Sequence, residues 1–535
     1  MLTFDNSPPV YWFIGYALAA FVVFSGFSKT ISTRIFVMSA IMLLIFMRLP
    51  IIVFNRELNP DESQMLSHAI TLFQDPIYWR SVDGTTIGPL DNYLLVIPKL
   101  LGFQINYTSG RVMGILCTAG SLFFLFLTLK NWFSPGVSRK IFLVPLLFLT
   151  FTQEIDFVHY SSEQLPVFLL ALCVWLLSRA MTHAGHIKHN LYFLGLAAGM
   201  IPFAKLQAVP QALVLAAAGF WVAYQYLRDK KSINPLIFLV LGGLTFPFLT
   251  LIWTLTFNVF ADFIDFYLLG NAIYAGGKGF LEIPAQFVRI FKLSTDFQIF
   301  TLALTFPMVF AFIRIFRRLN VKTANFAVPV TIVMLLLSSI YAVTKSGNDF
   351  IHYLNFCIIP FTLLAAYGVS KSEKWALVFP AIMLLWFGAY DAYHFVKERK
   401  LNAFVSVEAR TLAQSPVVIA LKKYTEAGDY MAVWGWQCVY YVEVQLAQAT
   451  AENHSERSIF SHPMQEIYRS RYLTDIERNK PAVILDAVGK NSFWVQNKKA
   501  QGLASYPELF QYVEANYKFI GDFDDTGLYV RKDRL

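Results

Sequence analysis

Long apolar runs alternate with short polar segments over the first 392 residues of the chain. Twelve runs have a length close to that of a bilayer span, at 9–27, 35–54, 112–129, 141–153, 164–180, 191–204, 208–226, 234–259, 298–316, 325–344, 353–370 and 374–392. A membrane-crossing helix needs about 20 predominantly apolar residues. The pattern therefore predicts an α-helical polytopic membrane protein with about twelve spans.

The pattern changes after residue 392, where charged residues become frequent and the apolar segments become short. The segments 429–436 and 481–488 are typical of buried strands, and 517–532 is typical of two strands joined across an Asp-Asp-Thr-Gly turn. Helical segments lie between them. We expect two domains, a transmembrane domain over 1–392 and a soluble α/β domain over 393–535.

The polar segment 55–111 is too regular for a simple connection. Asn59 and Pro60 form a helix-start signal, and Asp61 and Glu62 follow in the first turn, where the helix dipole favours acids. Apolar residues then recur at helical spacing as far as Phe73. The segment 93–103, interrupted by Pro98, shows a second such pattern. The loop is predicted to hold amphipathic helices that lie on the membrane surface.

Charge is divided between alternate connections. One set carries 16 Lys and Arg in 52 residues, namely 28–34, 130–140, 179–190, 227–233, 314–324 and 371–374, while the other set carries 9 in 116 residues. The positive-inside rule makes the first set cytoplasmic. The net charge of +9 is thus a topology signal, and no nucleic-acid partner is expected. Twelve spans then place both termini and the soluble domain outside.

Composition agrees with this interpretation. Hydrophobic residues make up 56% of the chain and charged residues 15%. The first apolar run lacks the basic start and the cleavage site of a signal peptide, so we expect it to remain as a span. The four cysteines offer neither a disulfide framework nor a Cys-x-x-Cys zinc site. Acids are enriched in the outer connections, 14 against 2, which suggests chemistry on the outer face.

Three further segments hold candidate functional residues. Lys205 interrupts the apolar stretch 195–215, and such a lysine either binds a phosphate or extends to the interface. Residues 345–360 place Lys345, His352 and Tyr353 at the outer end of a span, where they could contact a phosphate or form an aromatic belt. Arg80 and Arg111 of the first outer loop could line or anchor a donor groove.

The segment 152–165 gathers side chains that could ligate a metal, namely Glu154, Asp156, His159 and Glu163. His159 and Glu163 are four residues apart and could share one helical face. A divalent ion there would compensate a donor phosphate. The alternative is a role in acceptor binding or helix capping.

The early Asp-Glu pair, the helix after it, the stretch DPIYWRSVDGTTIGPLDNYLL and the arginine before the next span resemble the GT-C superfamily of membrane glycosyltransferases. The likeness covers about residues 35–370 and is greatest to the protein O-mannosyltransferase and lipid A aminoarabinose transferase group. It implies a polyprenyl-phosphate sugar donor and action on the outer face. It also implies that Asp61 is the catalytic carboxylate and that Glu62 helps to position the acceptor.

The resemblance extends to other residues and departs at one point. Lys205, His352 and Tyr353 resemble donor-phosphate residues of the superfamily, and Glu154-x-Asp156 resembles the metal motif of its oligosaccharyltransferase branch. The aminoarabinose transferase group has Lys-Pro-Pro where this chain has Ile87-Gly88-Pro89. Another cation must therefore contact the phosphate. The mannosyltransferase branch works without a metal, so a divalent ion is possible and not required.

The chemistry agrees with this resemblance. A phosphate-linked sugar already has a good leaving group, so the reaction needs a base for the acceptor hydroxyl and cations near the departing phosphate. We expect a single inverting displacement with Asp61 as the base. The acceptor is a lipid, a glycan or a protein, and the location is the inner (plasma) membrane with the active site on the periplasmic side. The alternatives are a lipid-linked sugar flippase and an O-antigen-type polymerase. A flippase would usually have two matching halves with charged residues near the middle of the bilayer.

Overall fold

The computed structural model describes residues 4–274, 279–317, 327–369, 378–405 and 407–535. These residues form two compact units. The helical unit contains Met1–Val53, Gly114–Ile252 and Tyr274–Val407, and the mixed unit contains Phe54–Met113, Trp253–Ile273 and Glu408–Leu535. The first outer loop therefore belongs to the same unit as the C-terminal strands. The domain boundary at 392 and 393 stays a prediction.

The long helices occur where the sequence predicts spans. They are α1 (Pro8–Phe27), α2 (Thr33–Val53), α6 (Tyr107–Trp132), α7 (Pro135–Phe151), α9 (Gln164–Thr182), α10 (Ile187–Ala204), α11 (Val209–Lys230), α12 (Asn234–Thr256), α16 (Thr295–Arg317), α17 (Ala327–Thr344), α18 (Asn355–Val369) and α19 (Val378–Glu398). The expected span ends at 325, 370 and 374, and parts of the connections 314–324 and 371–374, lie outside the described residues.

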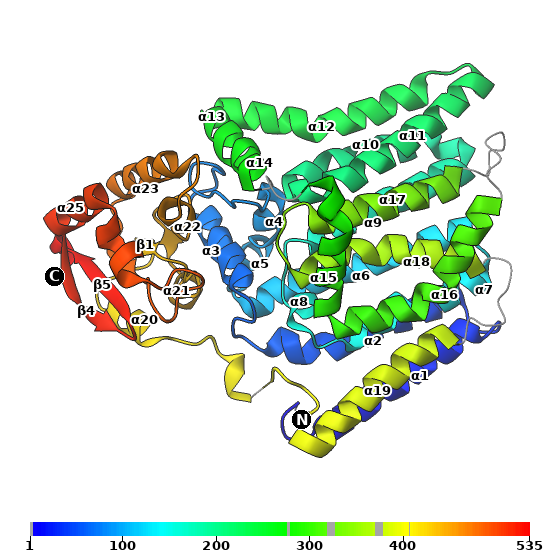
Figure 1. The fold of residues 1–535 in the computed structure, drawn as a ribbon, viewed down its shortest axis with the longest axis horizontal. Helices are drawn as coiled ribbons and strands as arrows, with labels where there is room; N and C mark the ends of the chain where they lie inside the picture. The colour runs from blue at the N-terminus through cyan, green and yellow to red at the C-terminus, as the bar shows by residue number, and fades with distance from the viewer. Residues whose placement is uncertain (1–3, 275–278, 318–326, 370–377, 406) are drawn as a thin grey trace. The chain divides into compact units, whose positions relative to one another are not determined.

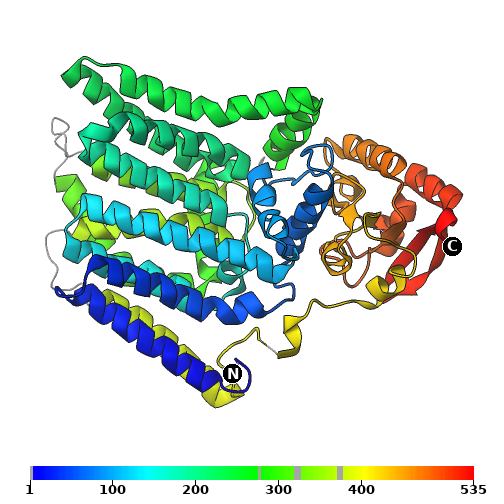
Figure 2. The same cartoon turned by 180° about the vertical axis from the view of Figure 1, so that it is seen from behind.

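Nine segments of the described chain are helical, long and apolar enough to cross a membrane. The long helices of the helical unit lie side by side (Figures 1 and 2). The α18 helix is buried along almost its whole length, whereas α12 is mostly exposed. An apolar helix that stays exposed in the folded chain has the surface expected against lipid. The protein is a multi-pass membrane protein.

Glycines allow two helices of this bundle to approach closely. A Cβ atom on Gly195 of α10 would lie 2.2 Å from the carbonyl oxygen of Leu239, and one on Gly242 of α12 would lie 2.0 Å from that of Tyr192. Small residues let the backbones of membrane helices come into contact. Any larger side chain at either position would push α10 and α12 apart.

Short helices fill the connections of the helical unit. They are α8 (Ile155–Val158), η1 (Ala184–His186), η2 (Leu206–Ala208), η4 (Phe280–Glu282), α15 (Ile283–Leu293) and η6 (Ile351–Leu354). A further helix, α14 (Gly270–Tyr274), joins the two units in sequence.

The mixed unit combines the first outer loop with the C-terminal region. Its helices are α3 (Pro60–Gln74), α4 (Pro89–Leu94), α5 (Ile97–Leu100), α13 (Phe260–Asp262), the π-helix η3 (Phe263–Leu269), η7 (Val407–Arg410), α20 (Pro416–Leu421), α21 (Val439–Val444), α22 (Glu456–Ile459), α23 (Gln465–Asn479), α24 (Lys498–Gln501), η8 (Leu503–Ser505), α25 (Pro507–Asn516) and η9 (Lys532–Arg534).

A five-stranded sheet organises the C-terminal region, with the order β2-β1-β3-β5-β4. The strands are β1 (Tyr430–Trp434), β2 (Ala447–Gln448), β3 (Val483–Asp486), β4 (Tyr517–Phe523) and β5 (Thr526–Arg531). β1 pairs in parallel with β2 and β3, while β5 pairs antiparallel with β3 and β4. The predicted strands and hairpin are confirmed. Asp524 and Asp525 form the turn between β4 and β5, and both have positive φ angles.

Two aromatic pairs of the C-terminal region are part of its core. Trp434 and Tyr441 are fully buried, and Trp436 and Tyr440 are nearly so. The first outer loop shows the opposite case at the end of α5 and just beyond it, where Leu100, Leu101 and Phe103 are 70%, 69% and 66% exposed. These exposed apolar side chains fit the segment predicted to lie on a membrane surface. The α3 helix differs from that prediction, because every residue from Glu62 to Leu72 is buried.

Candidate active site

The Asp61-Glu62 pair opens α3, as the sequence predicts. The Asn59 side chain accepts a hydrogen bond from the backbone N–H of Asp61 at 3.0 Å, and Pro60 takes the first helical position. This cap holds the first turn and orients its partial positive charge toward the acids. The carboxylate of Asp61 is partly exposed and has no hydrogen-bond or ion-pair partner in the part of the chain that the structure describes.

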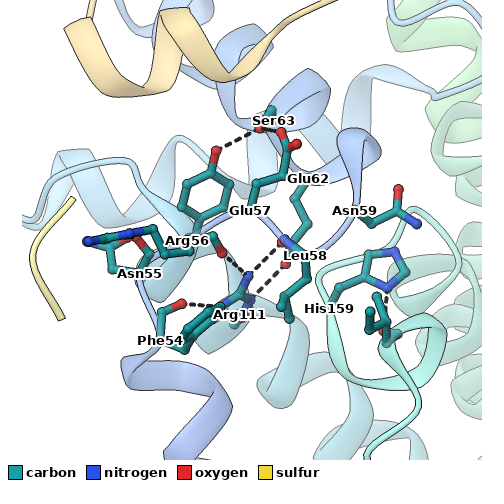
Figure 3. Close-up of polar contacts among 12 residues, drawn as sticks. Phe54, Asn55, Arg56, Glu57, Leu58, Asn59, Glu62, Ser63, Arg111 and His159 are labelled. Atoms are coloured by element: carbon teal, nitrogen blue, oxygen red, sulfur yellow. Dashed lines mark hydrogen bonds and ion pairs between the residues drawn. The ribbon is translucent and has the colours of Figure 1, made fainter. Parts of the chain in front are cut away.

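Glu62 has a different environment. Its two carboxylate oxygens accept hydrogen bonds from Nε and Nη2 of Arg111 at 2.8 and 2.7 Å, and both side chains are only 1% exposed. Arg111 also donates to the backbone oxygens of Phe54 and Arg56 (Figure 3). This bidentate pair fixes the start of the first outer loop against α3 and α6.

A third acid lies in the same stretch and was not singled out from the sequence. The Glu57 carboxylate accepts a hydrogen bond from the Ser63 hydroxyl, which is 2.7 Å from the hydroxyl of Tyr107. Burial raises the pKa of Glu57, and the nearby carboxylates of Glu62, Glu443 and Asp61 act in the same direction. The resulting pKa is about 7. The spacing Glu57-x-x-x-Asp61 was the only sequence signal for it.

The buried polar face of α3 bonds to the C-terminal region. Asn453 donates from its side-chain amide to the backbone oxygen of Gln64 at 2.8 Å and to the hydroxyl of Ser67 at 2.6 Å. The ring of His454 lies 3.1 Å from the Gln64 amide and stacks on Trp436 with ring centroids 4.0 Å apart. The segment that follows β2 therefore holds the helix that carries Asp61.

His454 is buried, and its electrostatic surroundings keep it neutral. Burial, with a smaller contribution from the adjacent Arg457, lowers its pKa to about 3. The ring is therefore neutral at ordinary pH. It forms a hydrogen bond with Gln64 and stacks on Trp436.

Arg80 is placed less centrally than the phosphate prediction implies. Its guanidinium pairs with Asp75 at the end of α3, with a separation of 2.8 Å, and the side chain is 40% exposed. Arg80 also lines a cleft within the mixed unit.

Three of the predicted phosphate residues meet within the helical unit. Lys205 donates to the carboxylate of Glu163 and lies 5.2 Å from the ring centroid of Tyr353. It also donates to the Ser162 hydroxyl at 2.6 Å. His352 contacts the same acid, with 3.9 Å between Nε2 and Glu163. Lys205 is thus a paired cation at the end of α10.

The acids of this cluster stay ionised despite burial. Burial alone would raise the pKa of Glu163, but Lys205 and His352 outweigh it and lower the pKa to about 2. Likewise, burial opposes ionisation of Asp156, while its hydrogen bond to His352 Nδ1 at 3.1 Å lowers the pKa. The cluster is a buried network of paired charges.

The four side chains proposed to bind a metal do not converge. Glu154 accepts from the Ser294 hydroxyl and from the backbone N–H of Asp296 at 2.9 Å, whereas Glu163 faces Lys205. His159 Nδ1 lies 2.7 Å from the backbone oxygen of Ile155. Within the described ranges, no group of three or more His, Cys, Asp or Glu side chains is placed to hold a metal ion. No step is therefore derived through a metal.

Lys345, the last of the predicted phosphate residues, follows α17. Its backbone N–H closes that helix by donating to the Tyr341 oxygen at 2.9 Å, and its side chain is partly buried. The structure therefore places it directly after α17, and its contact with a phosphate stays a prediction.

Solved structures match almost the whole chain. ArnT from Cupriavidus metallidurans bound to undecaprenyl phosphate has a TM-score of 0.56 and 10% identity, over 93% of this chain and 98% of its own. ArnT in the apo state gives 0.52 and 8% identity, over 98% of both chains. The chain has the GT-C fold. An oligosaccharyltransferase from Archaeoglobus fulgidus, in complex with zinc and sulfate, gives 0.44 and 10% identity, over 84% and 67%.

No protein-family model matches the sequence, and no curated protein matches it. The GT-C fold confirms the resemblance and the fold class that the sequence predicts, including the C-terminal region with its small sheet. The roles of single residues in this GT-C chain rest on the side-chain geometry. That geometry separates the partly exposed Asp61 from the buried Glu62–Arg111 pair.

Proposed function

We propose that the protein is a membrane glycosyltransferase that moves a sugar from a polyprenyl-phosphate donor to an acceptor hydroxyl. The observation that carries this proposal is the environment of Asp61, a partly exposed carboxylate on a capped helix of a chain with the GT-C fold, without a hydrogen-bond or ion-pair partner among the residues that the structure describes. The ArnT structure that contains undecaprenyl phosphate supports a donor of this lipid class. The multi-pass helical unit supports a lipid-soluble substrate as well.

The proposed reaction is a single displacement. The Asp61 carboxylate takes the proton of the acceptor hydroxyl, and the acceptor oxygen forms a bond to the anomeric carbon. The bond from that carbon to the phosphate oxygen breaks, and the polyprenyl phosphate leaves with the electron pair. The configuration at the anomeric carbon is inverted. Glu62 does not take part in the proton transfer, because both of its oxygens bind Arg111.

The donor phosphate requires cations. We propose Lys205 as the main one, supported by His352 and Tyr353, which lie beside it. Lys345 and Arg80 are proposed as further contacts. Since Lys205 is already paired with Glu163, its role would be to share its protons between that carboxylate and the phosphate.

The proposed site of action is the outer face of the plasma (inner) membrane. The basic connections support a cytoplasmic location for one set of loops, and the opposite set includes the Asp61 loop. The C-terminal region, 393–535, would share the periplasmic side.

A transfer assay tests the proposal. Purified protein in detergent is incubated with a panel of radiolabelled polyprenyl-phosphate sugars and candidate acceptors. We expect turnover of one donor, and a loss of about 10²- to 10⁴-fold in Asp61→Asn without loss of donor binding. Asp229→Asn, at an exposed acid on α11, is the matched control. Full activity in Asp61→Asn would refute the base assignment.

Two further arms use the same assay. A chelator tests the divalent ion that the 152–165 segment predicts from sequence. Labelled lipid that crosses a proteoliposome bilayer without consumption of any donor would instead support a flippase.

A further inference from the structure

An open cleft of about 570 Å³ lies within the mixed unit, between α23 and the segment formed by α13 and η3. One wall is a stripe along α23, where Ser470 and Thr474 are exposed and four residues apart. Side chains at this spacing project from one helical face. The opposite wall presents Asp262 and Asp265. The cleft is thus polar on both sides.

The acids of the cleft are available to a ligand. Among the described residues, neither Asp262 nor Asp265 has a hydrogen-bond or ion-pair partner for its carboxylate, although both are partly buried. Both carboxylates can therefore accept hydrogen bonds from a ligand in the cleft.

A fixed arginine lines the same cleft. Arg471 donates to Asp83 through Nη2 at 2.5 Å, and its guanidinium carbon lies 3.3 Å from the ring centroid of Phe266. Its Nε and Nη1 atoms are buried, and neither has a hydrogen-bond partner in the described part of the protein. The stacked ring and the buried Asp83 fix this guanidinium in place at the wall of the cleft, where Arg80 and Arg478 add two guanidinium groups that are 40% and 42% exposed.

The backbone around the cleft is unusual at two points. Residues 263–269 form a π-helix, a conformation that occurs mainly at functional sites. Trp79, which also lines the cleft, has a φ angle of 71°, in the left-handed region that bulky side chains rarely adopt. Both features cost stability and are consistent with a cleft whose shape is maintained for a ligand.

The ligand class follows from the two kinds of charged group on the walls of the cleft. A simple cation would be opposed by Arg80, Arg471 and Arg478, and a simple anion by four carboxylates on the same walls. Hydroxyl groups both donate to carboxylates and accept from guanidinium groups. We propose that this cleft binds a segment of a glycan, and that the glycan belongs to the acceptor. The second clause rests on the proposed glycosyltransferase function.

A glycan microarray tests the binding step. Full-length, fluorescently labelled protein in detergent is applied to an array of bacterial and mammalian glycans. We expect selective binding of a glycan set, with dissociation constants raised about tenfold in Asp262→Asn and in Asp265→Asn, the loss typical of a hydrogen bond to a charged group. The matched control is Glu477→Gln, an exposed acid on α23 that does not line the cleft.

The outcomes separate this proposal from the proposed function. The cleft assignment would be overturned if the protein bound no glycan selectively, or if Asp262→Asn and Asp265→Asn bound glycans as tightly as wild type does. Either result would count even if a donor is consumed. Selective capture of peptides in place of glycans would overturn it as well. If wild type consumes no donor but the cleft variants lose glycan binding, the glycan site stands and the enzyme proposal fails. Asp61→Asn should keep full glycan binding.

For the acceptor role, the transfer assay gives a second readout. Once a bound glycan is known, the cleft variants should raise its KM about tenfold and leave kcat nearly unchanged. An unchanged KM would show that the cleft holds a glycan that is not the acceptor.

Discussion

Asp61 and Glu62 are neighbours in the chain, yet their surroundings give them different chemistry. The Glu62–Arg111 pair is almost fully buried, so replacing one partner leaves an uncompensated charge. We expect Glu62→Gln to lower the free energy of unfolding by about 3–5 kcal/mol. Asp61→Asn should change it by less than about 1 kcal/mol, because this side chain is partly exposed and unpaired among the described residues.

Thermal unfolding in detergent, followed by intrinsic fluorescence, measures both effects. The double variant Glu62→Gln/Arg111→Met removes both charges and should recover part of the lost stability. Equal melting temperatures for wild type and Glu62→Gln would show that the pair does not anchor the loop.

Glu57 gives the second residue-scale prediction, a dependence of stability on pH. Its pKa is raised from 4.5 to about 7, so between these values the folded state holds a proton that the unfolded state releases. The Glu57 contribution to stability should therefore fall as pH rises from about 4.5 to 7, by about 3 kcal/mol at most. The measurement is chemical unfolding of wild type and Glu57→Gln across this range.

Other acids with raised pKa values, such as Glu452, shift stability in the same direction. The informative quantity is therefore the difference between the two proteins. Glu57→Gln should gain stability relative to wild type as the pH rises. A pH-independent difference would mean that Glu57 is ionised throughout the range.

At the scale of elements, α3 depends on the segment that follows β2. Asn453→Ala would leave the backbone oxygen of Gln64 and the hydroxyl of Ser67 without their buried donor. We expect a loss of about 1–3 kcal/mol in stability. If α3 shifts in this variant and displaces Asp61, kcat should fall by a larger factor than the KM for the donor rises. Lys518→Ala, at an exposed side chain on β4, is the control. Unchanged stability in Asn453→Ala would contradict this dependence.

The contact between α10 and α12 offers an internal comparison. A Cβ atom at Gly242 would meet the Tyr192 oxygen at 2.0 Å, whereas one at the adjacent Gly243 would meet nothing closer than 3.9 Å. Alanine favours a helix over glycine by about 1 kcal/mol. Gly243→Ala should therefore keep or raise the melting temperature, and Gly242→Ala should lower it. The same response in both variants would refute the close approach.

Sequence reasoning succeeded where structure depends on neighbouring residues. The Asn59 cap, the positions of the long helices and the 517–532 hairpin follow from local signals, and the described residues contain them. It did not find the pairing of Glu62 with Arg111, which are 49 residues apart. It also missed β2, because two residues carry no periodicity. Residues joined only by tertiary contact leave no pattern in a single sequence.

The same limit explains the partial success at the candidate site. Lys205 interrupts an apolar stretch, and His352 and Tyr353 lie at the end of a predicted span and match a motif of the superfamily; the three side chains lie together. The metal prediction rests on short sequence spacings within the segment 152–165, whose carboxylates contact Ser294, His352 and Lys205. Proximity along a loop does not fix the direction of side chains.

At the scale of the whole molecule, the number of crossings fixes the sides of the two termini. Nine helices of the described chain satisfy length and apolarity for a span, and an odd number would separate the termini. The sequence predicts twelve, and α7, α10 and α19 are the remaining three. The α7 helix is buried from Ile141 to Phe151, and a span inside a bundle needs less apolar surface than one facing lipid.

We therefore expect both termini on the periplasmic side. Alkaline phosphatase fused after Leu535 should be active. Green fluorescent protein fused at the same place should not fluoresce, because green fluorescent protein does not fold after it has been exported in an unfolded state. A cysteine introduced at Ser7 should react with a membrane-impermeant maleimide in intact cells, with Cys438 replaced by Ser. A fusion at Lys231, in a basic connection, should give the reverse pattern. Opposite sides for the two termini would mean an odd number of crossings and would remove the proposed periplasmic position of the C-terminal region.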